Sequence, residues 1–597
     1  MIDHKKSTLL ATLSVGCVLT LFIAVWASGL WVASDRWGIG DWGCNTARLE
    51  AIRATVVEFG QWPGNNPWIS GGLPLLGNPT LSLFSIPGVL SLFVGAHWGN
   101  QLAILLLIYI GWAGSWLLSG LWWKETWLRA VFSFYIIANP ALIHHLTGGH
   151  LAFPNFYFLP AAFYFFLRWS DDPWSGLKAG AILGLAFLHS LAYMVQYAFA
   201  VFFPILLCHY ILTPRGNWRP LLRWCTLFSL SFGTLCAYRI MTVLPVATAF
   251  PRMLEFKYHL SFAEVISVFF KPVVVQGMMV NPARLPYCYS TTELCAYLGL
   301  AATGLFVISS VLRFRWWHLA AMILAWASIG NDRAYHIMYW LQKLPLFSSH
   351  LCYARIRVFV FLFFGLAITD ALYLLWLRCK TLPFKIAVVS LGTLAAGEVL
   401  YVSHQIMRGS HTSTAVDVRP DYSSEFQNWG GYPFPPPKGL KALEFEGVLT
   451  YLGTLQNKGY LRGLGDSYVP GTSLARGRDE VGYIAEFHQD GRAVAPKYWS
   501  PNRILLEELD PEKPLNVNMN PGSAWHLNGS PAFPDQKIVE LQKPFIVMPD
   551  KNGVVELTYH SPGHVVGLIG TIVLGIALAV SIHFFRRARP LTEPRCA

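Results

Sequence analysis

Charged side chains are scarce in this sequence of 597 residues, where Asp, Glu, Lys and Arg together make up 13%. An ordinary soluble domain has about 25%, so the deficit excludes a conventional soluble protein. The formal net charge is +12, but no soluble segment carries a basic face. A nucleic-acid partner is therefore excluded as well.

Clustered cysteines are also missing. The ten cysteines form no Cys-x-x-Cys pair and no Cys/His cluster with the spacing of a zinc site, and most of them lie inside hydrophobic stretches. The sequence therefore implies no metal site and no disulfide framework. A disulfide bond between Cys288 and Cys295 stays an open alternative, because the two residues flank the start of one hydrophobic stretch.

Hydrophobic residues make up 54% of the chain and occur in blocks. A helix needs about 20 apolar residues to cross a hydrocarbon core of about 30 Å. The sequence thus predicts an α-helical polytopic membrane protein with about twelve transmembrane helices. We expect them at residues 8–33, 99–122, 127–144, 153–168, 178–195, 197–213, 223–247, 293–312, 316–330, 357–377, 384–403 and 563–585.

The first of these blocks has the basic flank of a secretory signal. It is longer than a signal core and is followed by Asp35-Arg36-Trp37 rather than by small residues suited to cleavage. A retained span is therefore expected rather than a cleaved peptide.

Basic residues set the orientation of the spans. If the N-terminus lies inside, every inner connection is basic, as the positive-inside rule requires. The inner residues are then Lys124, Arg129, Arg168, Lys178, Arg215, Arg219, Arg223, Arg313, Arg315, Arg378, Lys380, Lys385, Arg586, Arg587 and Arg589. An even number of spans returns the C-terminus to the cytoplasm, and residues 561–597 form the last span with a basic cytoplasmic tail.

Several basic residues oppose this orientation signal, because they lie beside the outer ends of spans. They are Arg252, Lys257, Lys271, Arg284, Arg333, Arg355 and Arg357. A ligand with negative charge at the outer face is the simplest reason for them.

The first outer loop, residues 34–81, is long. It begins with an Asp-bearing turn around Asp41 and continues as an amphipathic helix in which Leu49, Ile52 and Val56 form one apolar stripe. We expect this helix to lie on the membrane surface, with Glu50 on a solvated face. Residues 81–97 are apolar but short and contain a proline, which favours a re-entrant or interfacial helix over a span.

Residues 405–560 differ from the rest of the chain in composition. Gly, Pro, Asn, Asp and Tyr are frequent, and short alternating runs such as 514–518 and 554–559 read as strands between turns. They predict a β-rich, sandwich-like extracytoplasmic domain before the last helix. Residues 1–404 would then form the membrane domain. Aromatic residues of the soluble domain, Trp429, Trp499 and Trp525, read as core or inter-domain contacts more readily than as a sugar-binding face.

The order of these parts resembles the YfhO-like bacterial membrane proteins, within the GT-C glycosyltransferases that use polyprenyl-phosphate sugars. The resemblance covers nearly the whole chain and rests on short pieces in a fixed order. They are Asp41, 62–68, 71–75, 144–151, Glu293 with 297–299, 344–346, 354–357 and 518–525. It implies a GT-C-like fold and a multi-pass protein of the bacterial inner membrane. Expected partners are membrane lipids and a lipid-linked sugar as donor substrate.

Asp41 stands where this class of enzyme carries a carboxylate in its first outer loop. There the carboxylate is a general base or a metal ligand. A hydroxyl acceptor is a poor nucleophile until its proton is accepted, and general-base help contributes about 100- to 10,000-fold. The alternative for Asp41 is an Asx-type turn residue among glycines.

Three histidines, His144, His145 and His150, lie at the second outer loop, where many members of the class have an acidic residue. No Asp or Glu occurs between Glu125 and Asp171, which puts a metal-dependent mechanism in doubt, although a divalent cation stays open. Imidazole can bind a phosphate oxygen, act as a base or ligate a metal ion. His150 is preferred because the preceding glycines let the backbone approach a ligand. Capping of a helix end is the alternative.

A lipid-phosphate leaving group needs fixed positive charge, and guanidinium binds phosphate through two hydrogen bonds. Arg355 and Arg357 at the mouth of a span, and Arg239 within one, are the predicted phosphate-binding residues, with Glu293 as a further site candidate. Snorkelling toward the headgroups is the alternative for the arginines.

Three functions remain open at this stage. The favoured one is transfer of a sugar from a polyprenyl-phosphate donor to an outer-face acceptor. The missing second carboxylate keeps a non-catalytic assembly subunit of a membrane complex as the alternative. A lipid-linked-sugar transporter ranks last, because no internal repeat is evident.

Overall fold

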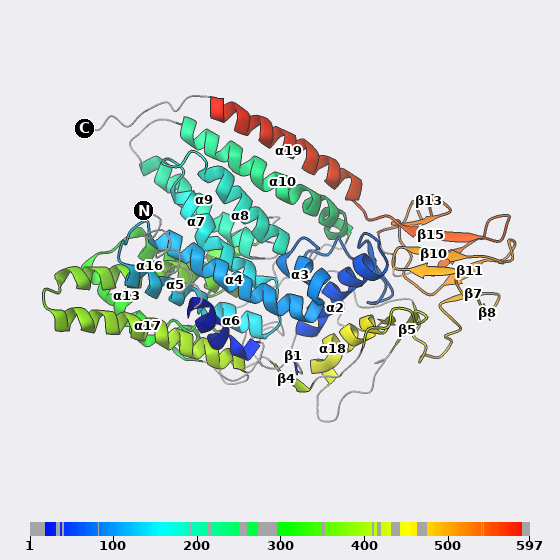
Figure 1. The fold of residues 1–597 in the computed structure, drawn as a ribbon, viewed down its shortest axis with the longest axis horizontal. Coiled ribbons are helices and arrows are strands. Elements are labelled where there is room, and N and C mark those ends of the chain that lie inside the picture. Colours follow the sequence, from blue (N-terminus) through cyan, green and yellow to red (C-terminus); the bar gives the residue numbers. More distant parts are fainter. Residues whose placement is uncertain are drawn as a thin grey trace, which may run out of the picture.

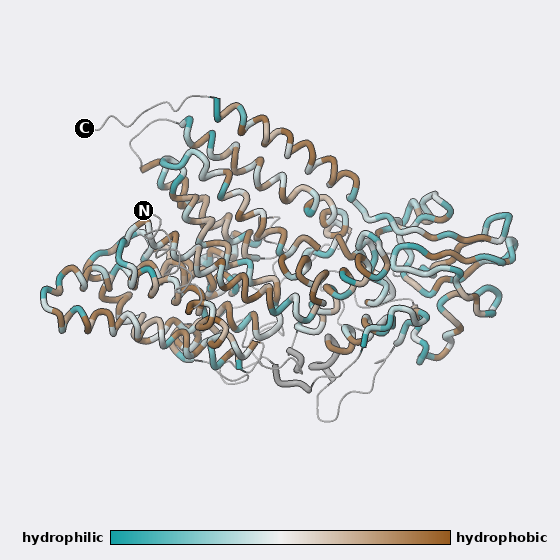
Figure 2. Tube along the Cα trace, in the orientation of Figure 1, coloured by the Kyte–Doolittle hydropathy of each residue, from teal (hydrophilic) through white to brown (hydrophobic). Residues whose placement is uncertain are grey.

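The computed structural model describes most of the chain. The described residues are 18–30, 36–38, 41–80, 83–190, 193–212, 218–249, 259–272, 295–344, 347, 353–408, 411–414, 419–430, 442–461, 475–538, 540 and 543–587. Figure 1 shows a bundle of long helices at one end and a group of strands at the other. Figure 2 shows that hydrophobic residues follow the helices, whereas hydrophilic residues are frequent along the strands and their turns.

Within the described residues, seven helical segments are long and apolar enough to cross a membrane. They are α4 (Ala96–Ser119), α5 with α6 (Thr126–Ile137 and Pro140–Thr147), α9 (Met194–Leu212), α10 (Arg219–Ala249), α16 (Arg357–Arg378), α17 (Leu382–Arg408) and α19 (His564–Arg587). Four shorter apolar helical segments accompany them: η3 with α7 (Phe153–Phe158 and Leu159–Leu167), α8 (Ser175–His189), α13 (Leu300–Leu312) and α14 (Trp316–Ala327). All coincide with predicted spans, which confirms a mostly helical membrane architecture. The total of twelve stays a prediction.

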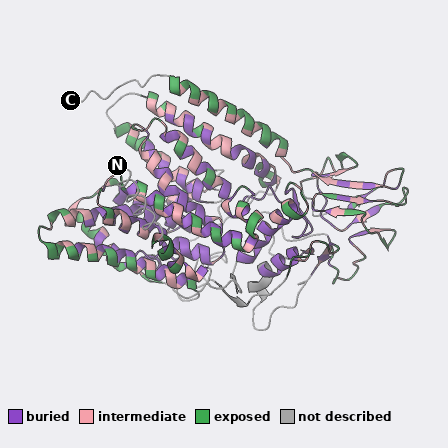
Figure 3. Ribbon diagram, viewed as in Figure 1, coloured by how far each residue is buried: buried purple, intermediate pink, exposed green. Residues whose placement is uncertain are grey.

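Burial differs strongly among these helices. The first sixteen residues of α16 are all buried, whereas α19 packs along α10 and is exposed over most of its length (Figure 3). Small residues permit the tightest contact. Gly176 and Gly180 of α8 lie against the backbone of α10, where a β-carbon would overlap the carbonyl oxygens of Trp224 and Phe228. Closely approaching helices with small residues at every fourth position are a common way to pack in a membrane.

Two carboxylates, the buried Asp370 and the partly exposed Glu398, organise the ends of helices. Asp370 of α16 accepts hydrogen bonds from Arg313, and Arg315 lies 3.6 Å away. Glu398 of α17 accepts hydrogen bonds from the hydroxyl of Tyr297 and from the backbone nitrogens that begin α13. A carboxylate at a helix N-terminus satisfies unpaired N–H groups and the helix dipole.

The first outer loop corrects one prediction. Helix α2 (Trp42–Arg53) continues into a π-helical turn, η2 (Ala54–Glu58), and is buried on nearly all sides rather than lying on the membrane surface. Glu50 is 1% exposed, so its predicted solvated face is wrong. It pairs with Arg53 at 2.6 Å and accepts a hydrogen bond from the hydroxyl of Tyr422 at 2.6 Å. A helix in the C-terminal half, α18 (Ala442–Leu455), covers α2, which no local pattern could indicate.

Helix α3 (Ile86–Val94) is nine residues long and lies against α4. Its length agrees with the expected interfacial helix, because nine residues are too few to span a bilayer. Three short helical segments complete this part: α11 (Phe262–Phe270), α15 (Ile337–Leu341) and η5 (Tyr353–Ile356). A one-turn segment, η1 (Ser28–Leu30), follows the first helix.

The C-terminal region is β-rich, as predicted. Two antiparallel sheets, with strand orders β13-β12-β15-β10-β9 and β14-β11-β7-β8, face one shared hydrophobic core. The strands are β7 (Phe487–Gln489), β8 (Arg492–Ala493), β9 (Tyr498–Ser500), β10 (Arg503–Leu506), β11 (Leu515–Val517), β12 (Trp525–Leu527), β13 (Ser530–Pro531), β14 (Phe545–Val547) and β15 (Val555–Tyr559). Trp525 is a core residue, and Trp499 stacks on Phe426 with ring centroids 4.6 Å apart.

Three two-stranded pairings join distant parts of the chain or close a loop. β1 (Arg36–Gly38) pairs antiparallel with β4 (His411–Thr414), and β5 (Gln427–Trp429) pairs parallel with β6 (Lys458–Tyr460). The third pairing, between β2 (Asn65–Asn66) and β3 (Leu73–Pro74), closes a hairpin in the first outer loop. The described residues between 411 and 461 therefore form a helix and short strands, and the sandwich strands begin at Phe487.

Glu486 joins β5 to the sandwich and gives the C-terminal region a pH-dependent stability. Its buried carboxylate accepts hydrogen bonds from the backbone and side chain of Asn428, from Asn518 and from Tyr483. Burial nevertheless raises the pKa of Glu486 from 4.5 to about 7. Between these values unfolding releases a proton. The free energy of unfolding therefore falls as pH rises from 4.5 to 7, by at most about 3 kcal/mol.

We expect Glu486→Gln to remove this slope. Thermal unfolding of the whole protein, followed by tryptophan fluorescence between pH 5 and 8, checks it. Because other groups also titrate, the wild type is compared with Glu512→Gln, an exposed residue of the same region whose substitution leaves the profile unchanged. A Glu486→Gln profile parallel to the wild type would contradict the expectation.

Candidate functional site

Asp41 precedes α2 and has the N-cap position, but its side chain makes no capping hydrogen bond. The alternative interpretation of Asp41 as an Asx-type turn residue therefore lacks the side-chain hydrogen bond that defines such a turn. The backbone N–H of Asp41 donates to the carbonyl of Gly148 at 3.0 Å, which fixes the residue against the end of α6. Its side chain is 53% exposed, and a carboxylate oxygen lies 3.5 Å from Nε2 of His150.

The turn after α6 holds His150 in this place. Asn45 donates to the carbonyl of Gly149 at 2.7 Å, and the indole of Trp42 donates to that of Thr147 at 3.2 Å. Gly149 has φ +81°, where side chains are disfavoured. A β-carbon there would overlap the backbone of Trp42 and Asp41. Only glycine therefore allows the two segments to meet this closely.

His145 extends the contact between Asp41 and His150. Its Nδ1 lies 2.8 Å from Nδ1 of His150, and its ring stacks on Phe153 with centroids 4.0 Å apart. With hydrogen-bonded Nδ1 atoms, one imidazole donates and the other accepts, so at least one proton is shared by the pair. His144, also at the end of α6, is buried.

Arg355 approaches the same aromatic group from η5. Its guanidinium carbon lies 5.0 Å from the ring centroid of Phe153 and 4.2 Å from that of Tyr193. Tyr193 has φ +58°, which is rare for a residue with a side chain. Backbone in such a conformation concentrates at functional sites. We call Asp41, His145, His150, Phe153, Tyr193 and Arg355 the Asp41 cluster.

The other predicted arginines make contacts elsewhere. Arg239 is 1% exposed and donates to the backbone carbonyls of Leu76 and Asn78 in the first outer loop. Arg357 is 2% exposed and donates to the hydroxyl and the carbonyl of Ser328 at 3.1 and 2.8 Å. Glu293 lies outside the described residues. So does Cys288, whereas Cys295 is described and buried.

The structure thus brings together Asp41, His145, His150 and Arg355, which come from three separate parts of the sequence. Phe153 and Tyr193 connect them, and sequence reasoning missed both. The signal for Phe153 was weak, since it is one apolar residue shortly after the histidines. Chemically the group offers a solvent-accessible carboxylate, a proton-sharing imidazole pair and a fixed guanidinium, which together suit proton acceptance beside an anion.

Metal-ligating side chains also meet at a second place. Among the residues that the structure describes, His259, Asp332 and His336 form the one group of three such side chains with ligand spacing. These residues are separated along the chain, so the sequence alone predicts no metal site from them. The spacing of Asp332 and His336, four residues apart, is the local signal that was available.

The chain resembles a few solved structures at low similarity. The arabinofuranosyltransferase AftD from Mycobacteria aligns with a TM-score of 0.40 and 12% identity, over 66% of this chain and 27% of AftD. ArnT from Cupriavidus metallidurans aligns in its apo state with a TM-score of 0.38 and 15% identity. Bound to undecaprenyl phosphate, it aligns with a TM-score of 0.34 and 13% identity. Both ArnT alignments cover 67% of this chain and 77% of ArnT.

This chain therefore spans about a quarter of the length of AftD. No protein-family model and no curated protein matches the sequence, so the YfhO-like resemblance stays a prediction. The likeness to the solved structures is partial, and the candidate site is defined by the contacts of this chain alone.

Proposed function

We propose that this protein is a membrane glycosyltransferase of the GT-C type, which moves a sugar from a polyprenyl-phosphate donor to an acceptor at the outer face of a bacterial inner membrane. The observation that carries the proposal is the Asp41 cluster. An accessible carboxylate with no capping bond faces His150 at 3.5 Å, and Arg355 is fixed beside the same group of rings.

The chemistry follows from these groups. The acceptor oxygen forms a bond to the anomeric carbon while the bond from that carbon to the phosphate oxygen breaks. The acceptor proton passes to the Asp41 carboxylate, and the polyprenyl phosphate leaves with the bonding electrons. Arg355 stabilises the charge that develops on the phosphate, which fixed cations do best in a water-poor site. His150 holds the carboxylate in place. The Nδ1 atoms of His150 and His145 share a proton in the hydrogen bond between them.

The remaining predicted arginines have a positioning role in this proposal. Arg239 binds the carbonyls of the first outer loop, and Arg357 joins the start of α16 to the end of α14. Arg357 is two residues from Arg355, so the contact with Ser328 also limits where Arg355 can lie.

An apolar groove offers a place for the isoprenoid chain of the donor. It has a volume of about 840 Å³ and is lined by residues 18–22 and by α4, α5 and α17, among them Phe22, Trp116, Phe134 and Gly397. Helix α5 leads through Asn139 into α6, which ends at the histidines of the Asp41 cluster. A lipid tail in the groove would therefore follow a helix that reaches the proposed phosphate site.

We expect Gly397→Phe to weaken donor binding, because the new ring fills the groove. A β-carbon at Gly397 meets no atom within 4 Å, so a side chain can leave the helix there without a clash at its base. Gly304→Phe on α13 is the matched control, since Gly304 is equally open and does not line the groove. The measurement is the apparent KM for the donor in nanodiscs, with an expected increase of about tenfold, equivalent to about 1.4 kcal/mol. Equal values for the two variants would exclude the groove.

The direct test of the proposed function uses the purified protein in nanodiscs with a panel of radiolabelled polyprenyl-phosphate sugars. A membrane extract supplies acceptors, and released polyprenyl phosphate is separated by chromatography. Consumption of one donor supports the proposal. If no donor binds or is consumed, the proposal is wrong.

The second candidate is a non-catalytic assembly subunit with the same fold. The absence of any acidic residue between Glu125 and Asp171 favours it, because the enzyme class often has a second carboxylate there. Donor binding without turnover, in the presence of the membrane extract, would support this candidate instead.

A further inference from the structure

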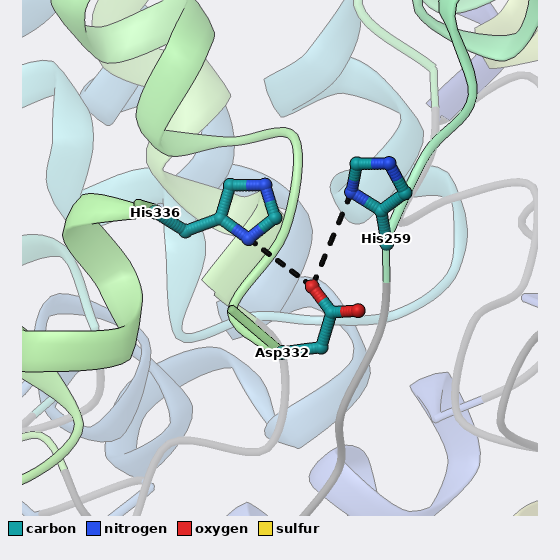
Figure 4. Close-up of side chains that lie close together, drawn as sticks. All are labelled: His259, Asp332 and His336. Carbon is teal, nitrogen blue, oxygen red and sulfur yellow. Dashed lines mark ion pairs between the residues drawn. The ribbon is translucent and has the colours of Figure 1, made fainter. Parts of the chain in front are cut away.

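The connection after α14 meets the segment before α11 at three polar side chains. Figure 4 shows His259 and His336 directed at the carboxylate of Asp332. Nδ1 of His336 lies 3.1 Å from Oδ1 of Asp332, and Nδ1 of His259 lies 4.0 Å from the same oxygen. All three candidate ligand atoms lie within 4.8 Å of one another.

The backbone presets this arrangement. Leu260 donates to the carbonyl of Ile329 at 3.0 Å, and an antiparallel bridge joins His259 to Gly330. His336 is the N-cap residue of α15, and its side chain makes no capping hydrogen bond. The two imidazole rings stack with centroids 5.1 Å apart. Both histidines are therefore held at the carboxylate by main-chain contacts.

His336 is an unusual side chain for a site without a ligand. Its side chain is 1% exposed, its Nε2 has no hydrogen-bond partner, and its Nδ1 contacts Oδ1 of Asp332 at 3.1 Å without the geometry of a hydrogen bond. Buried polar atoms nearly always have a partner, and leaving one unpaired costs about 1–3 kcal/mol. Arg333 lies 3.5 Å from the other oxygen of Asp332, so Oδ1 is the oxygen left for a ligand.

We propose that His259, Asp332 and His336 bind a divalent transition-metal ion, with Zn²⁺ as the preferred ion and water as the fourth ligand. Two imidazoles and one carboxylate suit zinc, whereas Mg²⁺ and Ca²⁺ prefer oxygen ligands. In a tetrahedral zinc site with bonds of about 2.0–2.1 Å, ligand atoms lie about 3.3 Å apart. The carboxylate oxygen lies 3.1 Å from His336 and 4.0 Å from His259, and no pair of ligand atoms is more than 4.8 Å apart, so side-chain rotations that draw His259 inward complete the site.

The metal would order a connection that bears on Arg357, the positioning residue two positions from Arg355. Ser328, the C-cap residue of α14, holds Arg357, and Asp332 follows four residues later. The ion thus joins the segment before α11 to the connection between the end of α14 and the start of α15. This inference concerns metal binding alone and stands whether or not the protein transfers a sugar.

The test measures zinc on the whole protein in nanodiscs after treatment with a chelator and one round of desalting. We expect one zinc ion per chain by elemental analysis after Zn²⁺ is added back, together with a rise in the unfolding temperature. His336→Gln and Asp332→Asn should each weaken zinc binding at least about tenfold in calorimetric titrations, since even outer-shell partners of metal sites contribute about 10–100-fold.

Two further variants keep the result interpretable. His259 is 40% exposed, so His259→Gln is expected to fold even if loss of the buried His336 disturbs the protein. His526 and His560 form another stacked pair, 4.0 Å apart, in the sandwich. The double variant His526→Gln/His560→Gln removes two imidazoles and should retain the zinc. Absence of zinc from the wild type, or full zinc binding by both His259→Gln and His336→Gln, would overturn the proposal.

Discussion

Replacement of Asp41 by Asn is expected to lower the rate of sugar transfer by about 100- to 10,000-fold, the usual contribution of a general base. The amide has nearly the shape of the carboxylate, so the backbone bond from Asp41 to Gly148 and the start of α2 should persist. Donor binding should change little, because the phosphate is assigned to Arg355. The effect therefore belongs in kcat rather than in the donor KM.

The control for this variant is Asp171→Asn. Asp171 is exposed, and its carboxylate accepts a hydrogen bond from the neighbouring Ser170. Its substitution should leave kcat unchanged. Turnover of Asp41→Asn at the wild-type rate would remove Asp41 from the proposed mechanism, and the Asp41 cluster would then lose its base.

Gly149→Ala is expected to impair both folding stability and turnover. A residue with a side chain at φ +81° costs about 1–2 kcal/mol, and the β-carbon also overlaps the backbone at Trp42 and Asp41. The turn must then move away from α2, which carries His150 away from the carboxylate. A displacement of about 1 Å can cost about 100-fold in rate.

A matched glycine separates the cost of the backbone conformation from the cost of the steric overlap. Gly529 has φ +84°, but a β-carbon there meets no atom within 4 Å. Gly529→Ala therefore includes the conformational cost without the overlap. Unfolding temperatures and transfer rates of both variants are compared with the wild type. If Gly149→Ala lowers neither quantity more than Gly529→Ala does, close contact between the two segments is unimportant.

Much of the architecture could be predicted because hydrophobic length is a local property. Each apolar helix lies on a block of the sequence that is visible without any tertiary information. The strands β11 and β15 were likewise marked by alternating residues. The burial of Glu50 could not be predicted, since it depends on Tyr422 and α18, more than 370 positions away. An amphipathic stripe is ambiguous between a membrane surface and a protein partner.

The candidate site was likewise predictable only in part. Asp41 could be named from the resemblance, which expects a carboxylate soon after the first span, and His150 from the two glycines before it. Their meeting, and the approach of Arg355 through Phe153 and Tyr193, depends on three-dimensional packing. The sequence predicted that the three arginines bind one phosphate together. In the structure Arg239 and Arg357 donate hydrogen bonds to backbone carbonyls, whereas Arg355 lies over the ring of Tyr193.

The pairing of β1 with β4 bears on the order in which the protein is completed during synthesis. Arg36 pairs with Thr414, and α2 is covered by a helix that begins at Ala442. In a growing chain, Arg36 and α2 leave the ribosome long before these partners do. The segment around Asp41 must therefore wait, with Glu50 still accessible to water, until more than two thirds of the polypeptide has been made.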